Sequence, residues 1–299
     1  MLALRTIRLG SVEGLLPASR LCVGRYKSSE AKEPMVLSST KNGVTTLTMN
    51  NPKRLNGWTK PMMDTLFAKI EEAGEDTATK ALIITGKGTY YCAGVNLADT
   101  IKPGHPQKLW EEIYVSNQKL FNTFLDCPKP VLVAANGPAI GASVTSATLC
   151  DGIIAAESAT FNTPFARLSI PPEGCSSVHF QRIMGQENAN KMLNDGWIPT
   201  AVEAKKAGFV LDVCKDDELT DKAQALAEKW IKDGKKREVA PDLKAVNEKE
   251  SRALASAFLS TGFLNAQYEF LKSKGKTQTA NVFWALKATR PVWGLFLKQ

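Results

Sequence analysis

The stretch of sequence that decides the fold covers residues 130–180 and reads PVLVAANGPAIGASVTSATLCDGIIAAESATFNTPFARLSIPPEGCSSVHF. It opens with a short apolar run, residues 131–135, that ends at the turn residues Asn136-Gly137-Pro138. The small residues of 139–150 suit a tightly packed helix, and a second apolar run follows at residues 152–156. Strand, glycine-bearing turn, helix and strand in this order predict a βαβ unit.

Two features of this stretch point to chemistry. A glycine-bearing turn at a helix N-terminus directs unpaired backbone N–H groups outward, where they can hold an anion or a developing oxyanion. Glu173 is a lone acid between Pro172 and Gly174 in an apolar neighbourhood, and such a carboxylate is a candidate proton carrier. On spacing alone Glu173 could equally be a solvated acid at a helix cap. The stretch therefore suggests oxyanion stabilisation combined with one general base.

Around this stretch the chain alternates strands and helices. Residues 35–39 and 44–49 read as strands joined by a hairpin turn at Lys41-Asn42-Gly43, and residues 80–85 read as a buried strand that opens into a second glycine-bearing loop around Gly94. Helical periodicity predicts helices over 59–75, 106–125, 177–184, 186–195, 200–207, 219–232 and 243–273, with a further short strand at 210–214. This order predicts an α/β core followed by an all-helical C-terminal part.

Composition and charge limit the classes of protein to consider. Of 299 residues 43% are hydrophobic, yet no apolar run approaches the roughly 20 residues that cross a bilayer. The six cysteines are scattered without a CxxC pair, and we interpret them as reduced thiols. The net charge of +8 would suggest a nucleic acid or membrane partner. Half of it falls on residues 1–28, however, so the remainder suits a small phosphate-bearing ligand equally well.

The N-terminal segment has the composition of a mitochondrial transit peptide. Residues 1–29 are rich in arginine, contain serine, hold the single acid Glu13 and repeat leucine and isoleucine periodically. A disordered N-terminal tail is the alternative. Residues 30–34 (EAKEP) read as a linker into the folded part.

Several common catalytic arrangements do not fit the sequence. His105 and His179 are the only histidines, no GxSxG elbow is present, and the serines beside His179 lie too near it in sequence for an obvious triad. The Walker and dinucleotide-binding patterns are missing, and no HExxH motif or carboxylate cluster supports a metal site. What remains is Glu173 and the loops of Gly94 and Gly141, although either glycine could serve a turn alone.

These residues resemble motifs of the crotonase (enoyl-CoA hydratase/isomerase) superfamily. The resemblance covers about residues 35 to 275 and has four motifs in the family's order. They are the CoA-side loop NPKRLN at 51–56, the first oxyanion loop YCAGVNL at 91–97, the second oxyanion loop ANGPAIGA at 135–142, and Cys150-Asp151. Asn96 stands where aspartate is commoner, which we expect to alter local hydrogen bonding and not the chemistry.

The resemblance implies a fold, a substrate class and an assembly. The implied fold is a spiral of ββα units over residues 35–215, with a helical C-terminal region at 216–299 that assembles homotrimers or dimers of trimers. The implied substrates are acyl-CoA thioesters, so that coenzyme A is part of the substrate and no separate cofactor or metal is expected. The implied oxyanion donors are the N–H groups of Val95 and Ala142. The residues expected to contact substrate or CoA are Lys53, Leu55, Ala93, Gly94, Val95, Asn96, Leu97 and Gly141.

The acidic residues favour one reaction within the family. By motif position Thr145 and Phe165 occupy the two places where hydratases carry catalytic glutamates. Glu173 occupies instead the position of the single catalytic glutamate in peroxisomal-type 3,2-enoyl-CoA isomerases, and the residues after Pro172 (EGCSS) resemble that subgroup closely. We therefore expect a 3,2-trans-enoyl-CoA isomerase that acts in the β-oxidation of unsaturated fatty acids, with Glu173 as the proton shuttle.

Several alternatives stay open at this stage. Lys53 and Arg54, together with the basic segment 272–299, are candidates for contacts with CoA, or ordinary surface charge. Another enolate reaction, in a dienoyl-CoA isomerase or an enoyl-CoA hydratase, is the nearest rival. An RNA-binding protein of this fold would need a basic stripe with aromatics, and residues 229–237 (KWIKDGKKR) are the only dense patch. A catalytically dead scaffold is the other rival. Because the chain ends in FLKQ and not in SKL, we expect the mitochondrial matrix rather than the peroxisome.

Overall fold

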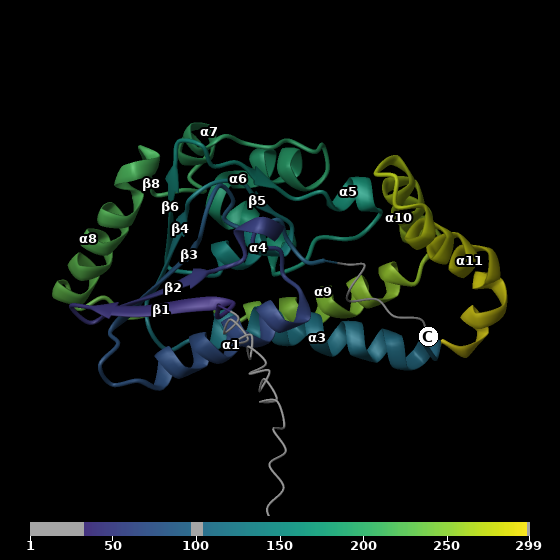
Figure 1. Cartoon of the computed structure of the whole chain (residues 1–299), viewed down its shortest axis with the longest axis horizontal. Coiled ribbons are helices and arrows are strands. Elements are labelled where there is room, and N and C mark those ends of the chain that lie inside the picture. Colours follow the sequence, from purple (N-terminus) through teal and green to yellow (C-terminus); the bar gives the residue numbers. More distant parts are fainter. Residues whose placement is uncertain (1–32, 97–103, 298–299) are drawn as a thin grey trace, which may run out of the picture. The chain divides into compact units, whose positions relative to one another are not determined.

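The computed structural model describes residues 33–96 and 104–297 of the chain. The transit peptide predicted at 1–29, most of the predicted linker and the candidate contact residue Leu97 lie outside the described residues. Residues from Pro34 onward cluster into one unit, which is the part described below (Figure 1).

A six-stranded sheet forms the centre of this unit. Its strand order is β1-β2-β3-β4-β6-β8, with β1 antiparallel to β2 and every other neighbouring pair parallel. The central strands β3 and β4 are apolar along their length because helices cover both faces of the sheet. The strands of this sheet are β1 Val36–Lys41, β2 Val44–Met49, β3 Ala81–Gly86, β4 Val131–Ala135, β6 Gly152–Ala156 and β8 Asp212–Cys214.

The predicted hairpin between β1 and β2 is confirmed. Asn42 and Gly43 both have positive φ, at 52° and 79°, as a tight two-residue hairpin turn requires. Glycine enters this conformation without a steric penalty, and asparagine tolerates it better than most residues. The turn chemistry therefore sets the register in which Val36 faces Met49.

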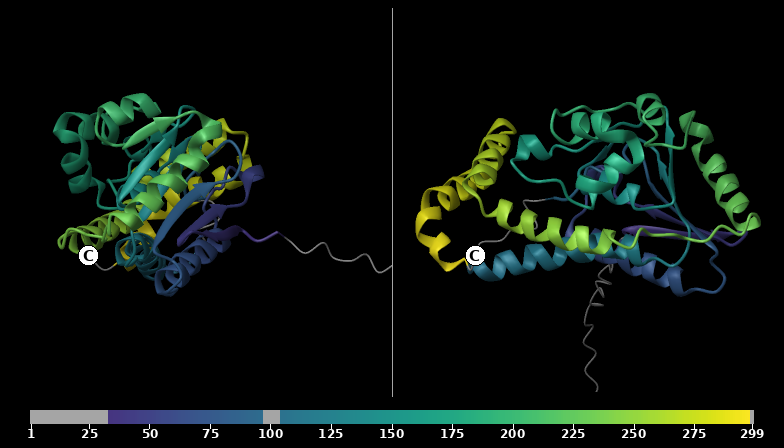
Figure 2. Two further views of the ribbon diagram at one scale, coloured as in Figure 1. Left: turned by 90° about the vertical axis from the view of Figure 1, so that its left-hand side faces the viewer. Right: turned by 180° about the vertical axis from the view of Figure 1, so that it is seen from behind.

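Helices pack on both faces of the sheet and extend beyond one end of it. In Figures 1 and 2, α8 lies along one face and α1 and α3 lie on the other side. The helices are α1 Lys60–Glu75, α3 Pro106–Asp126, α4 Ala142–Thr148, α5 Phe165–Leu168, α6 Ser176–Leu193, α7 Ala201–Lys206, α8 Leu219–Lys232, α9 Leu243–Phe258, α10 Thr261–Ser273 and α11 Thr277–Trp293. Short 3-10 helices occur at Pro52–Arg54, Asp216–Glu218 and Gly294–Phe296. The predicted order of an α/β core followed by helices is confirmed.

The structure corrects the sequence prediction in two places. The small-residue segment is not helical from residue 139, because Ala139–Ile140 forms strand β5, which pairs with β7 at Phe161–Asn162. Helix α4 begins only after Gly141. The φ of 63° and ψ of −129° at Gly141 are neither helical nor extended, so this residue separates strand β5 from the helix. The long helix predicted over 243–273 is two helices, since the Ser260 side chain accepts a hydrogen bond from the N–H of Phe263 and caps a new one, α10.

The C-terminal helical part is fastened to the α/β core by one buried ion pair. Arg237, in the connection between α8 and α9, binds Asp151 at 2.6 Å, and both side chains are at most 6% exposed. The same guanidinium donates to the carbonyl oxygens of Phe124 and Leu149, at 2.6 and 2.7 Å. The Asp151 carboxylate also accepts from the N–H of Val131 at 2.9 Å. These contacts determine where α9 begins relative to α3 and α4.

Replacing Arg237 by methionine should destabilise the fold strongly. The Arg237→Met variant leaves the buried Asp151 carboxylate without its cation, which typically costs about 3–5 kcal/mol of unfolding free energy. Urea unfolding followed by circular dichroism measures this loss. The control is Arg182→Met, which removes a solvent-exposed pair with Asp242 and should change the unfolding midpoint little. Equal effects of the two variants would contradict the structural role assigned to Arg237.

Candidate active site

Two glycine-bearing loops leave neighbouring strands at the same edge of the sheet. Strands β3 and β4 are parallel and adjacent, with Ile84 opposite Val133, so their carboxyl ends lie side by side. One loop runs from β3 through Gly94, and the other runs from β4 through Gly141 into α4. Open α/β sheets commonly bind ligands at such an edge.

Backbone contacts join these two loops directly. The N–H of Ile140 donates to the carbonyl oxygen of Cys92 at 3.0 Å, and the N–H of Cys92 donates to that of Pro138 at 3.3 Å. Gly94, with a φ of 82°, lies so close that a Cβ built on it would stand 2.6 Å from the carbonyl oxygen of Ile140. Both the conformation and the contact require glycine at position 94.

Val95 and Ala142, the residues that follow the two glycines, have their backbone N–H groups where the two loops meet. Ala142 is the first residue of α4, where the helix leaves an N–H without an intrahelical acceptor. Among the described residues, neither the N–H of Val95 nor that of Ala142 has a hydrogen-bond acceptor. A Cβ built on Gly141 would meet open space, so this side of the turn is uncovered in the described structure.

A third loop, between β2 and α1, lies against the first. The N–H of Ala93 donates to the carbonyl oxygen of Leu55 at 2.9 Å, and Trp58 exchanges backbone hydrogen bonds with Gly94 and Asn96. Leu55 therefore contacts the predicted contact residue Ala93, and Trp58 of the same loop pairs with Gly94, Val95 and Asn96. Lys53 lies in the adjoining 3-10 helix with its side chain exposed.

Glu173 lies between α5 and α6 and is only 7% exposed. One of its carboxylate oxygens, Oε2, accepts a hydrogen bond of 2.7 Å from the side-chain amide of Asn117 on α3. Burial raises the pKa of Glu173 to about 7, the hydrogen bond from Asn117 opposes this rise, and the charge of Glu250 adds to it. A carboxyl group with a pKa near neutrality can both accept and donate a proton at physiological pH.

The Glu173 segment packs against the helix that follows the second loop. A Cβ built on Gly174 would lie 2.7 Å from Oγ1 of Thr145 and 2.5 Å from the ring of Phe121. Thr145 is three residues beyond Ala142 on α4. The residue after Glu173 thus packs against the short helix α4, into which the second glycine loop leads.

The amide of Asn117 is a site residue that the sequence prediction missed. Ser251 on α9 donates to its Oδ1 at 2.8 Å, which turns its NH₂ group toward Glu173. The hydroxyl of Ser251 lies 3.2 Å from Oδ1 of Asn247, a further buried side chain of α9. A signal existed in the sequence, since Asn117 interrupts the apolar face of α3 between Ile113 and Phe121. A buried amide on an apolar face must have polar partners.

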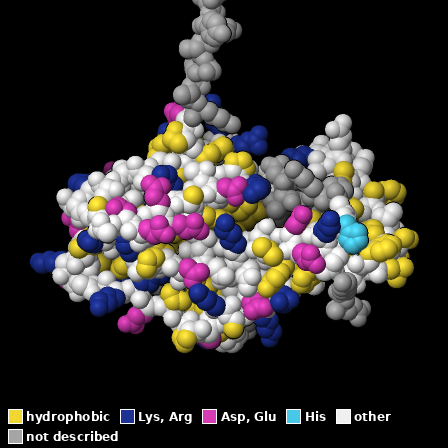
Figure 3. Space-filling model, turned by 90° about the horizontal axis from the view of Figure 1, so that it is seen from below, with side chains coloured by type: hydrophobic (Ala, Val, Ile, Leu, Met, Phe, Trp, Pro, Cys, Tyr) yellow, Lys and Arg dark blue, Asp and Glu magenta, His cyan; other side chains and the backbone are white. Residues whose placement is uncertain are grey.

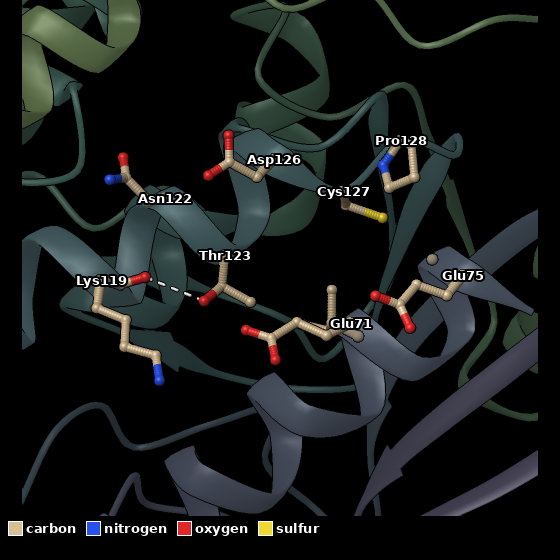
Figure 4. A pocket seen from close by; sticks show the side chains of 10 residues that line it. Glu71, Glu75, Lys119, Asn122, Thr123, Asp126, Cys127 and Pro128 are labelled. Atoms are coloured by element: carbon tan, nitrogen blue, oxygen red, sulfur yellow. Dashed lines mark hydrogen bonds between the residues drawn. The ribbon is translucent and has the colours of Figure 1, made fainter.

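Other polar features of the described residues lie away from this site. A cavity of about 380 Å³ opens between α1 and α3, and its lining includes Glu71, Lys119 and Asp126 but not Glu173 (Figure 4). Within residues 33–96 and 104–297, no cluster of three or more histidine, cysteine or acidic side chains could hold a metal ion. No helix among these residues is long and apolar enough to cross a membrane.

The fold and the paired glycine loops define the class of this protein. Residues 39–276 match the family model described as enoyl-CoA hydratase/isomerase, so the chain belongs to that family. The solved structure of an enoyl-CoA hydratase/isomerase from Pseudoalteromonas atlantica T6c superposes with a TM-score of 0.70 at 28% identity, covering 80% of this chain and 97% of that one. The crotonase fold expected from the sequence is therefore confirmed.

Two relatives of known name catalyse different reactions, so the comparison does not decide which reaction this protein catalyses. The chain is 32% identical over 271 residues to human enoyl-CoA delta isomerase 2, covering 87% of this chain and 68% of the human protein. It is also 32% identical over 205 residues to 2,3-dehydroadipyl-CoA hydratase of Escherichia coli strain K12, covering 66% of this chain and 76% of the bacterial protein. Relatives of both reaction types are thus equally similar in sequence over the aligned residues.

Proposed function

We propose that the protein is a 3,2-trans-enoyl-CoA isomerase, which moves a C3=C4 double bond of an acyl-CoA thioester to trans-C2=C3 during β-oxidation of unsaturated fatty acids. The observation that carries this proposal is the packing of the Glu173 segment against α4. Gly174, the residue after the buried Glu173, lies against Thr145 of a helix whose first N–H group has no acceptor among the described residues. The similarity to human enoyl-CoA delta isomerase 2 supports the same reaction.

In the proposed mechanism a single carboxylate transfers the proton. The Glu173 carboxylate takes a proton from C2 of the substrate, the electrons spread over a dienolate, and the same carboxyl group returns the proton at C4. The bond between C2 and its hydrogen breaks, the double bond moves to C2=C3, and a C–H bond forms at C4, so that no further reactant is consumed. A pKa of about 7 suits a group that must accept and release a proton in one turnover.

The charge of the dienolate falls on the thioester oxygen, for which we propose the N–H groups of Val95 and Ala142 as donors. Two N–H donors held by the backbone are preorganised, because their positions come from the contact of Gly94 with Ile140 and from the start of α4. Preorganised donors at a developing oxyanion are often the largest single contribution to a rate.

The residues at the two hydratase positions favour isomerisation over hydration. Addition of water to the double bond is commonly assisted by a second acid or base that positions the water, and Thr145 and Phe165 stand at the two positions where the resemblance would place hydratase glutamates. Phe165 is 2% exposed and belongs to the apolar core, so it adds no polar group that could hold a water molecule. The hydratase reaction is the second candidate, favoured by the similarity to the bacterial hydratase.

We propose that the coenzyme A part of the substrate binds at the loop between β2 and α1. The carbonyl oxygen of Leu55 accepts from the N–H of Ala93, which belongs to the proposed oxyanion loop, and the exposed Lys53 lies two residues before Leu55. A lysine next to the thioester site can pair with the phosphates of CoA. Because coenzyme A enters and leaves with the acyl group, the proposal includes no separate cofactor.

Location and assembly are further proposals. The composition of residues 1–29 favours import into the mitochondrial matrix, which fluorescence of a fusion carrying these residues tests. Hydrophobic side chains gather at the right-hand end of the face seen in Figure 3. Exposed apolar side chains near the C-terminal end favour an assembly such as the homotrimer or dimer of trimers that the resemblance implies. They include Trp284, Val292, Leu295 and Phe296. Analytical ultracentrifugation measures the assembly.

Replacing Glu173 by glutamine should abolish turnover while leaving thioester binding intact. The Glu173→Gln variant keeps the shape and an acceptor for the Asn117 amide but cannot carry the proton, so kcat for a 3-enoyl-CoA should fall on the order of 10²–10⁴-fold. Conversion to the trans-2 isomer is followed by ultraviolet absorbance. For the wild type, kcat/KM should rise with pH through about 7, as the carboxyl group becomes ionised. An active Glu173→Gln variant would place the base elsewhere.

Replacing Gly94 by alanine should damage the oxyanion site. The added Cβ would collide with the carbonyl oxygen of Ile140 and move the N–H of Val95, and losing one such donor typically costs 10²–10³-fold in kcat. The matched control is Gly234→Ala, which also places alanine at a positive φ, of 67°, but into open space. Both variants carry similar backbone strain, so equal kcat values would argue against Val95 as a donor.

A further inference from the structure

A buried acid on α9, Glu250, binds the segment that carries Glu173. One carboxylate oxygen of Glu250 accepts the N–H of Cys175 at 2.6 Å, and the other accepts the N–H of Ser177 at 3.0 Å. The hydroxyl of Ser177 donates to the second oxygen as well. Glu250 lies more than 70 residues away in sequence and is only 6% exposed. One buried carboxylate thus accepts three hydrogen bonds from the first turn of α6 and its N-cap residue.

The segment that Glu250 binds has an unusual backbone. Gly174 and Cys175, the two residues after Glu173, both have left-handed φ angles, of 66° and 64°. Cys175 carries a side chain, so it adopts this conformation only where its surroundings compensate the cost. The hydrogen bond from its N–H to Glu250 is one compensation, and the contact of its thiol with the carbonyl oxygen of Leu243 is another. The left-handed pair reverses the chain between Glu173 and α6.

The next residue on α9, Ser251, supports the carboxylate of Glu173 through Asn117. Ser251 donates to Asn117, and Asn117 donates to the Glu173 carboxylate. Two consecutive residues of α9 therefore reach Glu173 by two routes: Glu250 through the backbone that follows it, and Ser251 through the amide that binds its carboxylate. Neither residue needs to touch the substrate to affect where the proton is exchanged.

We propose that Glu250 is a positioning residue of the isomerase site: by binding the N–H groups of Cys175 and Ser177 it holds the Glu173 carboxylate at the place where it exchanges the proton. This inference rests on the proposed function. A misplacement of about 1 Å at a reacting group can cost on the order of 10²-fold in rate, so a remote contact can matter this much.

The charged groups near Glu173 influence its pKa and therefore the pH dependence of the proposed reaction. The charge of Glu250 raises the pKa of Glu173, and burial raises the pKa of Glu250 itself, against the hydrogen bonds from Ser177 and Cys175. From α6, Arg182 pairs with Asp242 at the surface beside α9. His179, also on α6, is half-buried and donates from Nε2 to the carbonyl oxygen of Thr148, and burial lowers its pKa. Removing the charge of Glu250 should therefore lower the pKa of Glu173.

A purely structural role for Glu250 makes a different prediction. An acid at a helix N-terminus commonly stabilises the helix alone, and its loss then lowers the unfolding free energy without altering the chemistry of the folded enzyme. A positioning role lowers kcat of the folded fraction at unchanged KM, whereas the pH profile reports the loss of the Glu250 charge under either role. The two roles are thus separable in kinetics measured below the unfolding temperature.

The test compares Glu250→Gln with Glu248→Gln on the same helix. Glu248 is exposed, pairs with Arg252, and takes no part in the contacts of Glu173. With a 3-enoyl-CoA, Glu250→Gln should reduce kcat about 10- to 100-fold with KM little changed, and the acid limb of kcat/KM should move to lower pH. Glu248→Gln should match the wild type in all three measurements. Thermal unfolding of each variant establishes the temperature at which the enzymes are folded.

The outcomes distinguish a failure of the proposed function from a failure of the inference about Glu250. A wild type that converts no 3-enoyl-CoA would overturn the proposed function, whereas an active wild type with Glu250→Gln equal to Glu248→Gln would overturn the inference alone. If Glu250→Gln does not fold, Ser177→Ala decides, because it removes one of the three contacts and leaves the charge in place. A threefold or greater loss of kcat in Ser177→Ala at unchanged KM supports the positioning role, and an unchanged kcat contradicts it.

Discussion

The close approach of the Gly94 backbone to the carbonyl oxygen of Ile140 is the contact on which the rest of the site depends. Two adjacent parallel strands deliver their loops to one edge of the sheet, and only a residue without a side chain lets the loops meet there. Once they meet, the residues after the two glycines are constrained as well. The N–H of Val95 and that of Ala142 follow from this contact and from the start of α4, not from any side chain of their own.

The second constraint is the burial of a carboxylate in an otherwise apolar region. A buried charge is costly unless hydrogen bonds compensate it, and the compensation at Glu173 comes from α3 through Asn117. The same burial raises the pKa of Glu173, which suits the proposed proton transfer. The polar side chains of α9 that support Asn117 are buried in turn. Stability and proposed chemistry therefore depend on one set of contacts.

The C-terminal helices are thus part of the site and not an appendage to the core. The buried pair of Arg237 and Asp151 fastens the chain just ahead of α9 to the carbonyl ends of α3 and α4. From that anchor α9 presents Glu250 and Ser251 to the Glu173 segment. An element without a proposed substrate contact can in this way control the geometry of a reacting group.

Local sequence signals predicted most of the secondary structure. The structure confirms the features that have a local physical cause. These are the Asn42-Gly43 turn, the apolar runs of β3, β4 and β6, and the helical periodicity of α1, α3 and α8. The predicted start of α4 was wrong. The strand pairing of Ala139–Ile140 with Phe161–Asn162 joins residues that are distant in sequence, and it outweighs the local helix propensity. The break at Ser260 was missed for lack of a strong stop signal.

For the site, the sequence by itself determined which groups are available: one acid in an apolar stretch, two glycines after strands, and a family pattern that relates them. It could not show that Asn117 binds Glu173, nor that Glu250 binds the turn after it, because those partners lie 56 and more than 70 residues away and no local periodicity links them. Only the tertiary structure decided those pairings, since a buried polar group takes its partners from whichever elements pack around it.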